Sequence, residues 1–336
     1  YNKGYTVRGS ARPSPKFFFH FVPEKLRISL TLYEIANSPM SKTKISYIYV
    51  SLAVFLWAST AAVAKLLLQD ITNIQLTFYS FIFSILGLLT IVIAQGKLRL
   101  LKEYKAKDFI RMAYMGTLGC YLYYIFLFGA IMYAPAQEAF IVNYMWPMMV
   151  VIFAILILKE KMTLKKMLGL VLSFLGVYIV ATKGELLSFT FSNAKGDILA
   201  ILGAISYGLF SVLGKKHKYE TFTSMLMYYC FGFILVLITI FAFSSIPKVS
   251  LAQLAGLAWL GVMTNALAFV FWFKALEYGD TAKMANIVFL TPFLSLVYIY
   301  FLIDEPILMS SIIGLVIIVL GIAIQESRKR AIKTEN

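Results

Sequence analysis

Long apolar blocks separated by short polar connections dominate the chain. Ten blocks are recognisable, at roughly 45–68, 74–95, 108–132, 136–158, 164–182, 196–214, 222–244, 252–276, 281–303 and 307–325. Each is close to the roughly 20 residues that a helix needs to cross the hydrocarbon core of a bilayer. None alternates apolar and polar residues with the period of two that a membrane β-barrel requires. The pattern predicts an all-α integral membrane protein with ten transmembrane helices.

The composition supports a membrane protein and argues against metal or cofactor chemistry. Of the 336 residues, 60% are hydrophobic and only 14% are charged, whereas soluble domains carry about 25% charged residues. The two cysteines, Cys120 and Cys230, have no disulfide or metal-site spacing, and the two histidines, His20 and His217, lie outside the apolar blocks. We therefore expect no metal site and no cofactor.

The net charge of +15 raises the question of a nucleic-acid partner, but the distribution of the charge points to a membrane instead. Lysine and arginine gather in alternate connections, at 97–107, 159–166, 215–218 and 328–333, while the opposite connections carry little beyond Lys183, Lys195 and Lys248. By the positive-inside rule, the basic connections and both termini are cytoplasmic. We expect a multi-pass protein of the plasma (inner) membrane with no nucleic-acid partner.

The chain contains an internal repeat. The segment that begins at Trp146 resembles the segment that begins at Thr291, and the matched residues lie 145 positions apart: Pro147 and Pro292, Glu160 and Glu305, Gly169 and Gly314, Gly176 and Gly321. The first and sixth blocks also align, at an offset of 150, from Trp57 and Tyr207. Five helices per copy is an odd number, so the copies cross the membrane in opposite senses. Such inverted repeats are typical of secondary transporters with a site between the halves.

These features divide the chain into four parts. Residues 44–183 and 196–326 are the two five-helix repeats, and 327–336 form a basic cytoplasmic tail. Residues 1–43 are an irregular extension, in which Met40 looks like a natural start; a transit peptide is the alternative. The glycines of 169–176 and 314–321 predict close helix packing, either within the chain or between the protomers of a homodimer.

The layout resembles the EamA type of the drug/metabolite transporter superfamily. Within it, the motif Glu138, Val142, Asn143, Tyr144, Trp146 and Pro147 is similar to the branch that exports aromatic amino acids. The second half has "NIVFLTP" instead of this motif. The resemblance implies a transporter rather than an enzyme, exporting small metabolites through a cavity lined by helices 1, 3, 4, 6, 8 and 9.

Polar and aromatic residues inside the apolar blocks are the candidates for substrate binding, because polar groups in a membrane core usually face a cavity or another helix. The candidates are Trp57, Tyr124, Glu138, Asn143, Trp146, Asn265, Trp272 and Asn286. If 136–158 is one continuous helix, Glu138, Asn143 and Trp146 share a face. Pro147 and Pro292 are expected to kink their helices. Structural alternatives remain: an interfacial acid at Glu138, amides that tie helices together, and tyrosines that pack or sit at the membrane interface.

Two lysines end equivalent helices. Lys215 is interpreted as a positive-inside anchor, whereas Lys65 lies on the outer side, where it can meet a substrate carboxylate, pair with Glu138 or extend to the surface. The favoured function is alternating-access export of small metabolites, such as amino acids (aromatic ones among them) or related amphiphilic compounds. The alternative is a transporter of nucleotide sugars or other anionic metabolites, which needs a basic cavity. A membrane enzyme and a non-transporting receptor fit the sequence less well.

Overall fold

The computed structural model describes residues 41–133, 142–185, 187, 193–246, 248–303 and 307–326. The helices discussed below all belong to the unit Lys42–Asn336. Residues 1–40 of the expected extension, the tail 327–336 and the candidate Glu138 lie outside the described residues.

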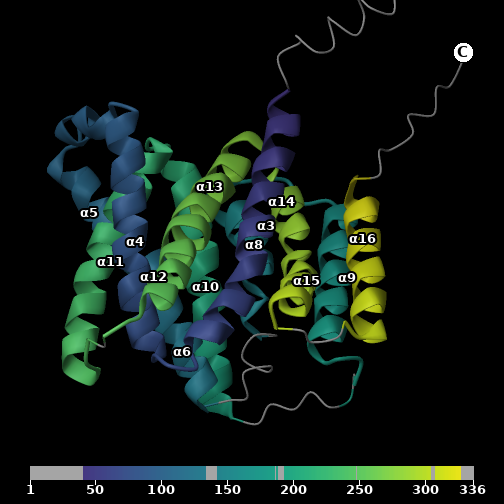
Figure 1. The fold of residues 1–336 in the computed structure, drawn as a ribbon. Coiled ribbons are helices and arrows are strands. Elements are labelled where there is room, and N and C mark those ends of the chain that lie inside the picture. Colours follow the sequence, from purple (N-terminus) through teal and green to yellow (C-terminus); the bar gives the residue numbers. More distant parts are fainter. Residues whose placement is uncertain are drawn as a thin grey trace, which may run out of the picture. The chain divides into compact units, whose positions relative to one another are not determined.

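The described residues form helices and connections, with no residue in a β-strand (Figure 1). The helices are α3 (Lys42–Leu67), α4 (Asn73–Ala94), η1 (Lys97–Lys102), α5 (Ala106–Met115), η2 (Gly116–Leu122), α6 (Tyr123–Tyr133), α8 (Trp146–Leu158), α9 (Leu164–Ala181), α10 (Ala194–His217), α11 (Thr221–Phe243), α12 (Leu251–Ala258), η3 (Trp259–Leu267), α13 (Ala268–Tyr278), α14 (Thr281–Val288), α15 (Thr291–Ile303) and α16 (Met309–Glu326).

Eight helical stretches of the described chain are long and apolar enough to cross a membrane. They correspond to the expected blocks except 108–132 and 136–158, where α5–η2–α6 and the shorter apolar helix α8 lie. The all-α, multi-pass prediction is thereby confirmed. The count of ten, the inverted repeat and the cytoplasmic side of the termini stay predictions.

The helices α9 and α16 pack against each other through their glycines (Figure 1). A Cβ added at Gly176 would lie 2.6 Å from the carbonyl oxygen of Gly314, and one at Gly321 would lie 2.6 Å from that of Gly169. The pairing of 169 with 321 and 176 with 314 makes the two helices antiparallel. The glycine stripes are thus engaged within the chain, so they give no support to the homodimer, which stays a prediction.

Pro147 and Pro292 were expected to kink their helices, but each lies just after a turn that interrupts the helix. A turn at Tyr144–Met145 precedes α8, and a turn at Phe289–Leu290 precedes α15, so each proline is the second residue of a new helix. The first turn of a helix tolerates proline because its N–H groups have no intrahelical partner there. The premise that one unbroken helix carries Asn143 and Trp146 was wrong, since the turn lies between them, and Glu138 lies outside the described residues.

Two π-helical segments widen the third and eighth expected helices at matched positions. The segment η2 (Gly116–Leu122) and the end of η3 (Trp259–Leu267) are 145 residues apart, as Gly116 and Gly261 show. Extra residues in a turn displace the side chains that follow, and such segments are frequent at functional sites. Here η3 carries Asn265, one of the candidate binding residues.

Candidate functional site

A cavity of about 380 Å³ lies among α3, α4, α6, α10, η3, α13 and the two interrupted helices. Its size falls within the roughly 300–1,000 Å³ of small-molecule sites. Aromatic, aliphatic, hydroxyl and amide side chains line it, and no charged side chain of the described residues is among them. The cavity therefore offers aromatic contact and neutral hydrogen bonds rather than ion pairing.

Aromatic rings build one wall of the cavity. The Trp57 ring lies 6.0 Å from Trp146 and 5.6 Å from Phe269, both edge to face, and Trp146 lies 4.7 Å from Tyr207. Edge-to-face pairs are favoured because the positive ring edge meets the negative ring face. The indole Nε1 of Trp57 donates to the Thr264 carbonyl at 3.1 Å. This carbonyl contact fixes the ring, so the wall is pre-organised for a flat apolar group.

Two amides supply the polar part of the cavity. The Tyr124 hydroxyl donates to Asn265 Oδ1 at 3.0 Å, and the Tyr123 hydroxyl donates to Asn143 Oδ1 at 3.3 Å. Asn143 Nδ2 has no hydrogen-bond partner within the described part of the chain, and neither has the Tyr207 hydroxyl. A buried polar group without a partner costs about 1–3 kcal/mol. A ligand that satisfied these groups would recover part of that cost.

The cavity wall is built from positions that match between the two halves of the sequence. Trp57 faces it at the position equivalent to Tyr207, and Tyr124 at the position equivalent to Phe269. Asn143 and Trp146 match Val288 and Thr291, which also line the cavity. At these two positions the first half contributes an amide and an indole where the second half contributes Val288 and Thr291, while the second half supplies the amide of Asn265.

The structure brings five predicted site residues to one cavity and places two elsewhere. Trp57, Tyr124, Asn143, Trp146 and Asn265 all line the cavity.

Trp272 and Asn286 are fully buried outside the lining. The Trp272 Nε1 donates to Ser211 Oγ at 3.0 Å, behind the wall, while the Asn286 amide donates to Gln325 Oε1 at 2.8 Å and so ties α14 to α16. We correct both to packing residues.

Sequence reasoning missed Tyr123, Tyr207, Phe269 and Thr291 as lining residues. Tyr207 and Phe269 were within reach of the sequence, because the repeat aligns them with Trp57 and Tyr124. No comparable signal marked Tyr123, since the chain has 21 tyrosines and many of them pack between helices.

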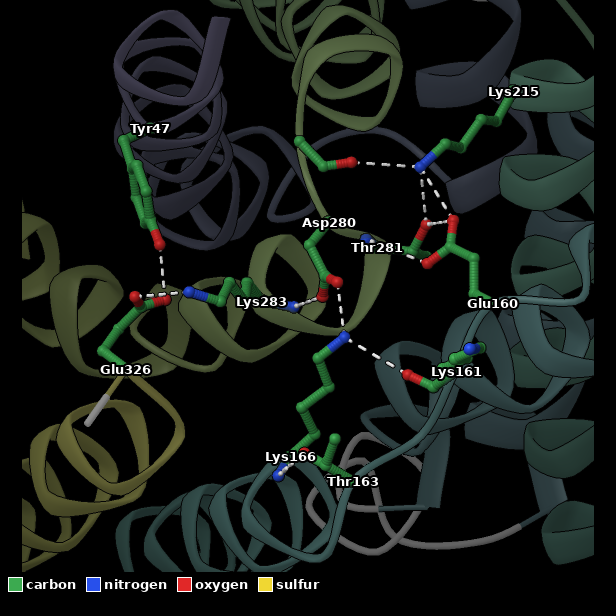
Figure 2. Close-up of polar contacts among 11 residues, drawn as sticks. Tyr47, Glu160, Lys161, Thr163, Lys166, Lys215, Asp280, Thr281, Lys283 and Glu326 are labelled. Carbon is green, nitrogen blue, oxygen red and sulfur yellow. Dashed lines mark hydrogen bonds and ion pairs between the residues drawn. The ribbon is translucent and has the colours of Figure 1, made fainter. Parts of the chain in front are cut away.

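A polar network surrounds the connection between α13 and α14 (Figure 2). The Lys215 Nζ donates to Glu160 Oε1 at 2.9 Å, to the Gly279 carbonyl at 3.0 Å and to Thr281 Oγ1 at 2.9 Å. The Thr281 hydroxyl in turn donates to Glu160 at 2.6 Å. The sequence did not predict these contacts, which use all three donors of the ammonium group; the interpretation of Lys215 as a positive-inside anchor stays a prediction.

The same connection is held by a second set of contacts (Figure 2). Lys166 pairs with Asp280, whose carboxylate also caps α14 by accepting from the Lys283 N–H at 3.1 Å. The Lys283 ammonium then pairs with Glu326 at 2.6 Å, and the Tyr47 hydroxyl donates to the same carboxylate. Residues of α3, α9 and α16 thereby converge on one short segment.

The comparison with known proteins decides the family. The model of the EamA-like transporter family matches residues 44–182 and 194–325. The chain belongs to the EamA-like transporter family. It is therefore a multi-pass membrane protein of a transporter family, embedded in a lipid bilayer. Its relatives are named as transporters rather than enzymes.

Several known proteins are similar to this chain in sequence or in fold. An uncharacterized transporter of Archaeoglobus fulgidus is 24% identical over 84% of this chain and 98% of its own length. Protein PecM of Dickeya dadantii is 23% identical over 66% of this chain and 77% of its own length. A solved crystal structure superposes with a TM-score of 0.76 at 20% identity, covering 85% of this chain and 98% of that one. This last likeness supports the fold alone.

Proposed function

We propose that this EamA-like transporter exports a small amphiphilic metabolite, and that an amino acid with an aromatic side chain is the class that fits the cavity best. The observation that carries the proposal is the cavity wall itself. Trp57, Trp146, Tyr207 and Phe269 offer aromatic faces and edges, and the amides of Asn143 and Asn265 lie within the same 380 Å³ space. The aromatic ring of such an amino acid suits the aromatic wall, and its zwitterionic head group suits the amides.

The charge of the cavity disfavours the alternative of nucleotide sugars or other anionic metabolites. A phosphate group is usually recognised by lysine or arginine, and the described lining has neither. Lys65, which was the candidate for an anion contact, is absent from that lining. Anion transport through this cavity would leave a net charge without a counter-charge, which is costly in a buried site, whereas a zwitterion carries no net charge.

The mechanism we propose is alternating access between two inverted five-helix halves, with both termini on the cytoplasmic side of the plasma (inner) membrane. The two segments that the family model matches support the division into halves. The antiparallel packing of the equivalent helices α9 and α16 supports opposite orientations. The basic connections support the assignment of sides.

The decisive test is transport by purified protein in liposomes, with and without a proton gradient. The panel is labelled phenylalanine, tryptophan, threonine, a cationic dye and a nucleotide sugar. We expect phenylalanine and tryptophan to move fastest. Transport of the nucleotide sugar alone would favour the anionic alternative, and transport of nothing in a broader metabolite panel would refute export by this cavity.

A pair of matched variants locates the transported solute. Trp146→Ala removes the ring at the centre of the wall, while Trp259→Ala makes the same change at a residue that is 37% exposed and outside the cavity. We expect transport to fall about twofold to tenfold for Trp146→Ala only, because contact with an aromatic ring contributes about 0.5–1.5 kcal/mol beyond its buried area. Equal transport by both folded variants would remove Trp146 from the site.

A further inference from the structure

The polar network and the cavity are reached by the same helices, at points about two turns or more apart. On α10, Tyr207 lines the cavity and Lys215 belongs to the network. These residues are eight positions apart, or about 12 Å along a helix. On α8, Trp146 lies at the cavity and Glu160 follows the far end of the helix. The cavity is also lined by Leu68, which directly follows α3. The network therefore lies in line with the cavity, on the side away from Leu68.

A layer of buried aromatic rings separates the two. Phe210 is fully buried, and its ring lies 5.1 Å from that of Phe273. Trp272, hydrogen-bonded to Ser211, lies 5.5 Å from Trp146 on the cavity side. These buried rings lie next to the network, which suits the layer to closing the cavity at this end.

A second cavity lies on the other side of this closure. It has a volume of about 590 Å³ and is lined by Gly214, Lys215 and Phe273 together with polar residues such as Lys218 and Glu220. Lys215 and Phe273 thus belong both to the closure and to the second cavity. Residues of the aromatic layer and of the network therefore form part of the wall of the second cavity, which is the arrangement expected of a closed passage.

The network is suited to opening because it is polar and its charges are not deeply buried. The side chains of Lys215 and Glu160 are 19% and 25% exposed, so water can replace their mutual contacts when they separate. A pair of this kind contributes little to stability overall. It does join three elements that must move apart for a passage to form: the α8–α9 connection, α10 and the start of α14.

We propose that Glu160, Lys215 and Thr281 form the gate that closes the transport cavity at this end, and that their separation opens the cavity toward the second one. The gate rests on the proposed transport function. These are positioning residues, since they hold the α13–α14 connection against α10 rather than contact solute in the cavity. Weakening them shifts the population toward a state that is open at this end, as any change that favours one of two conformations must.

Cysteine accessibility tests the gate without knowledge of the substrate. Ser211→Cys places a fully buried thiol between the cavity residue Tyr207 and Lys215 on α10, in a background where Cys120 and Cys230 are alanine. The rate of its reaction with a membrane-impermeant maleimide is measured in detergent. We expect Lys215→Met to raise this rate by about tenfold or more, because a hydrogen-bonded charge is lost.

Further variants separate the gate from general loosening of the fold. Thr281→Ala removes one hydroxyl and should raise the labelling rate less, while Lys215→Arg should restore most of the protection. Lys97→Met is the matched control: it breaks the 2.8 Å pair with Glu220, which also joins separate elements but includes no residue of the gate.

A second reporter, Ser295→Cys, lies in the lining of the transport cavity. Its labelling should fall when the gate opens, because alternating access closes one end as the other opens. Unchanged labelling of Ser211→Cys in folded Lys215→Met and Thr281→Ala protein would overturn the gate, and so would an equal increase in Lys97→Met. If the labelling changes as expected while no solute of the panel moves, the gate stands and the substrate assignment fails.

Discussion

The contact between α9 and α16 allows a quantitative prediction about a single methyl group. Alanine at Gly176 would place its Cβ 2.6 Å from both the Gly314 carbonyl oxygen and Ile318 Cγ1. That is about 1 Å closer than an ordinary van der Waals contact. Because one of these atoms belongs to the backbone, rotation of a side chain cannot relieve the contact, and the two helices must move apart.

The expected loss follows from two opposing terms. Overpacking costs about 1–3 kcal/mol, and replacing glycine by alanine in a helix recovers about 0.5–1 kcal/mol. The net loss then lies between about 0 and 2.5 kcal/mol, and its midpoint, at about 2–4 °C per kcal/mol, lowers the unfolding temperature by about 3–5 °C. The matched variant Gly321→Ala should lose a similar amount, because its Cβ would meet the Gly169 carbonyl oxygen, also at 2.6 Å.

Thermal unfolding in detergent, followed by the loss of monodisperse protein on size-exclusion chromatography, measures this effect. Gly129→Ala is the control, since its nearest neighbour is the end of the Leu199 side chain at 3.1 Å, which can move aside. We expect that control to stay within about 1 °C of the original protein. The reasoning is refuted if Gly176→Ala unfolds at the same temperature as Gly129→Ala, because the helices would then not be in the close contact described.

Three further predictions concern the cavity and its surroundings. Asn286→Ala should lower the unfolding temperature, because the Gln325 amide loses its partner, yet leave the order of preferred solutes unchanged in the liposome assay. Tyr124→Phe removes a hydrogen bond in the cavity wall and should raise the KM for the transported solute by about threefold to tenfold, from a hydrogen bond of about 1 kcal/mol. Burial raises the pKa of Glu220, but the Lys97 ammonium and the backbone N–H groups of α11 outweigh this effect and hold the pKa below its ordinary value. The stability of the folded protein should therefore fall as the pH drops through that lowered pKa. Glu220→Gln should abolish this acid dependence when unfolding is measured as a function of pH.

The positions of the interrupted helices show where sequence patterns reached their limit. Pro147 and Pro292 were recognisable as a matched pair from the chain alone, and a disturbance of both helices was predictable. A complete turn at Tyr144–Met145 was not, because proline is compatible both with a kink inside a helix and with the first turn of a new one. A turn and a kink orient the following residues differently, so they bring different side chains to the cavity.

The candidate site shows a similar division. Trp57, Asn143 and Trp146 were identified because polar and indole groups are conspicuous among aliphatic residues, and they do line the cavity. Asn286 was equally conspicuous, but its amide is turned toward Gln325 on α16. A polar residue in an apolar helix needs a partner, and the sequence does not say whether that partner is a solute or another helix.

The chain's hydropathy is sufficient for the membrane-spanning, all-helical character, because that depends on composition and order along the chain, and its resemblance to EamA-type transporters pointed to the family. Which face of each helix points inward could be identified only from the tertiary structure. A helix that is apolar all round gives no periodic signal of which side it buries, so the convergence of Lys215, Glu160 and Thr281 was not visible beforehand. Those contacts join residues up to 121 positions apart, and the rotation and packing of the helices alone bring them together.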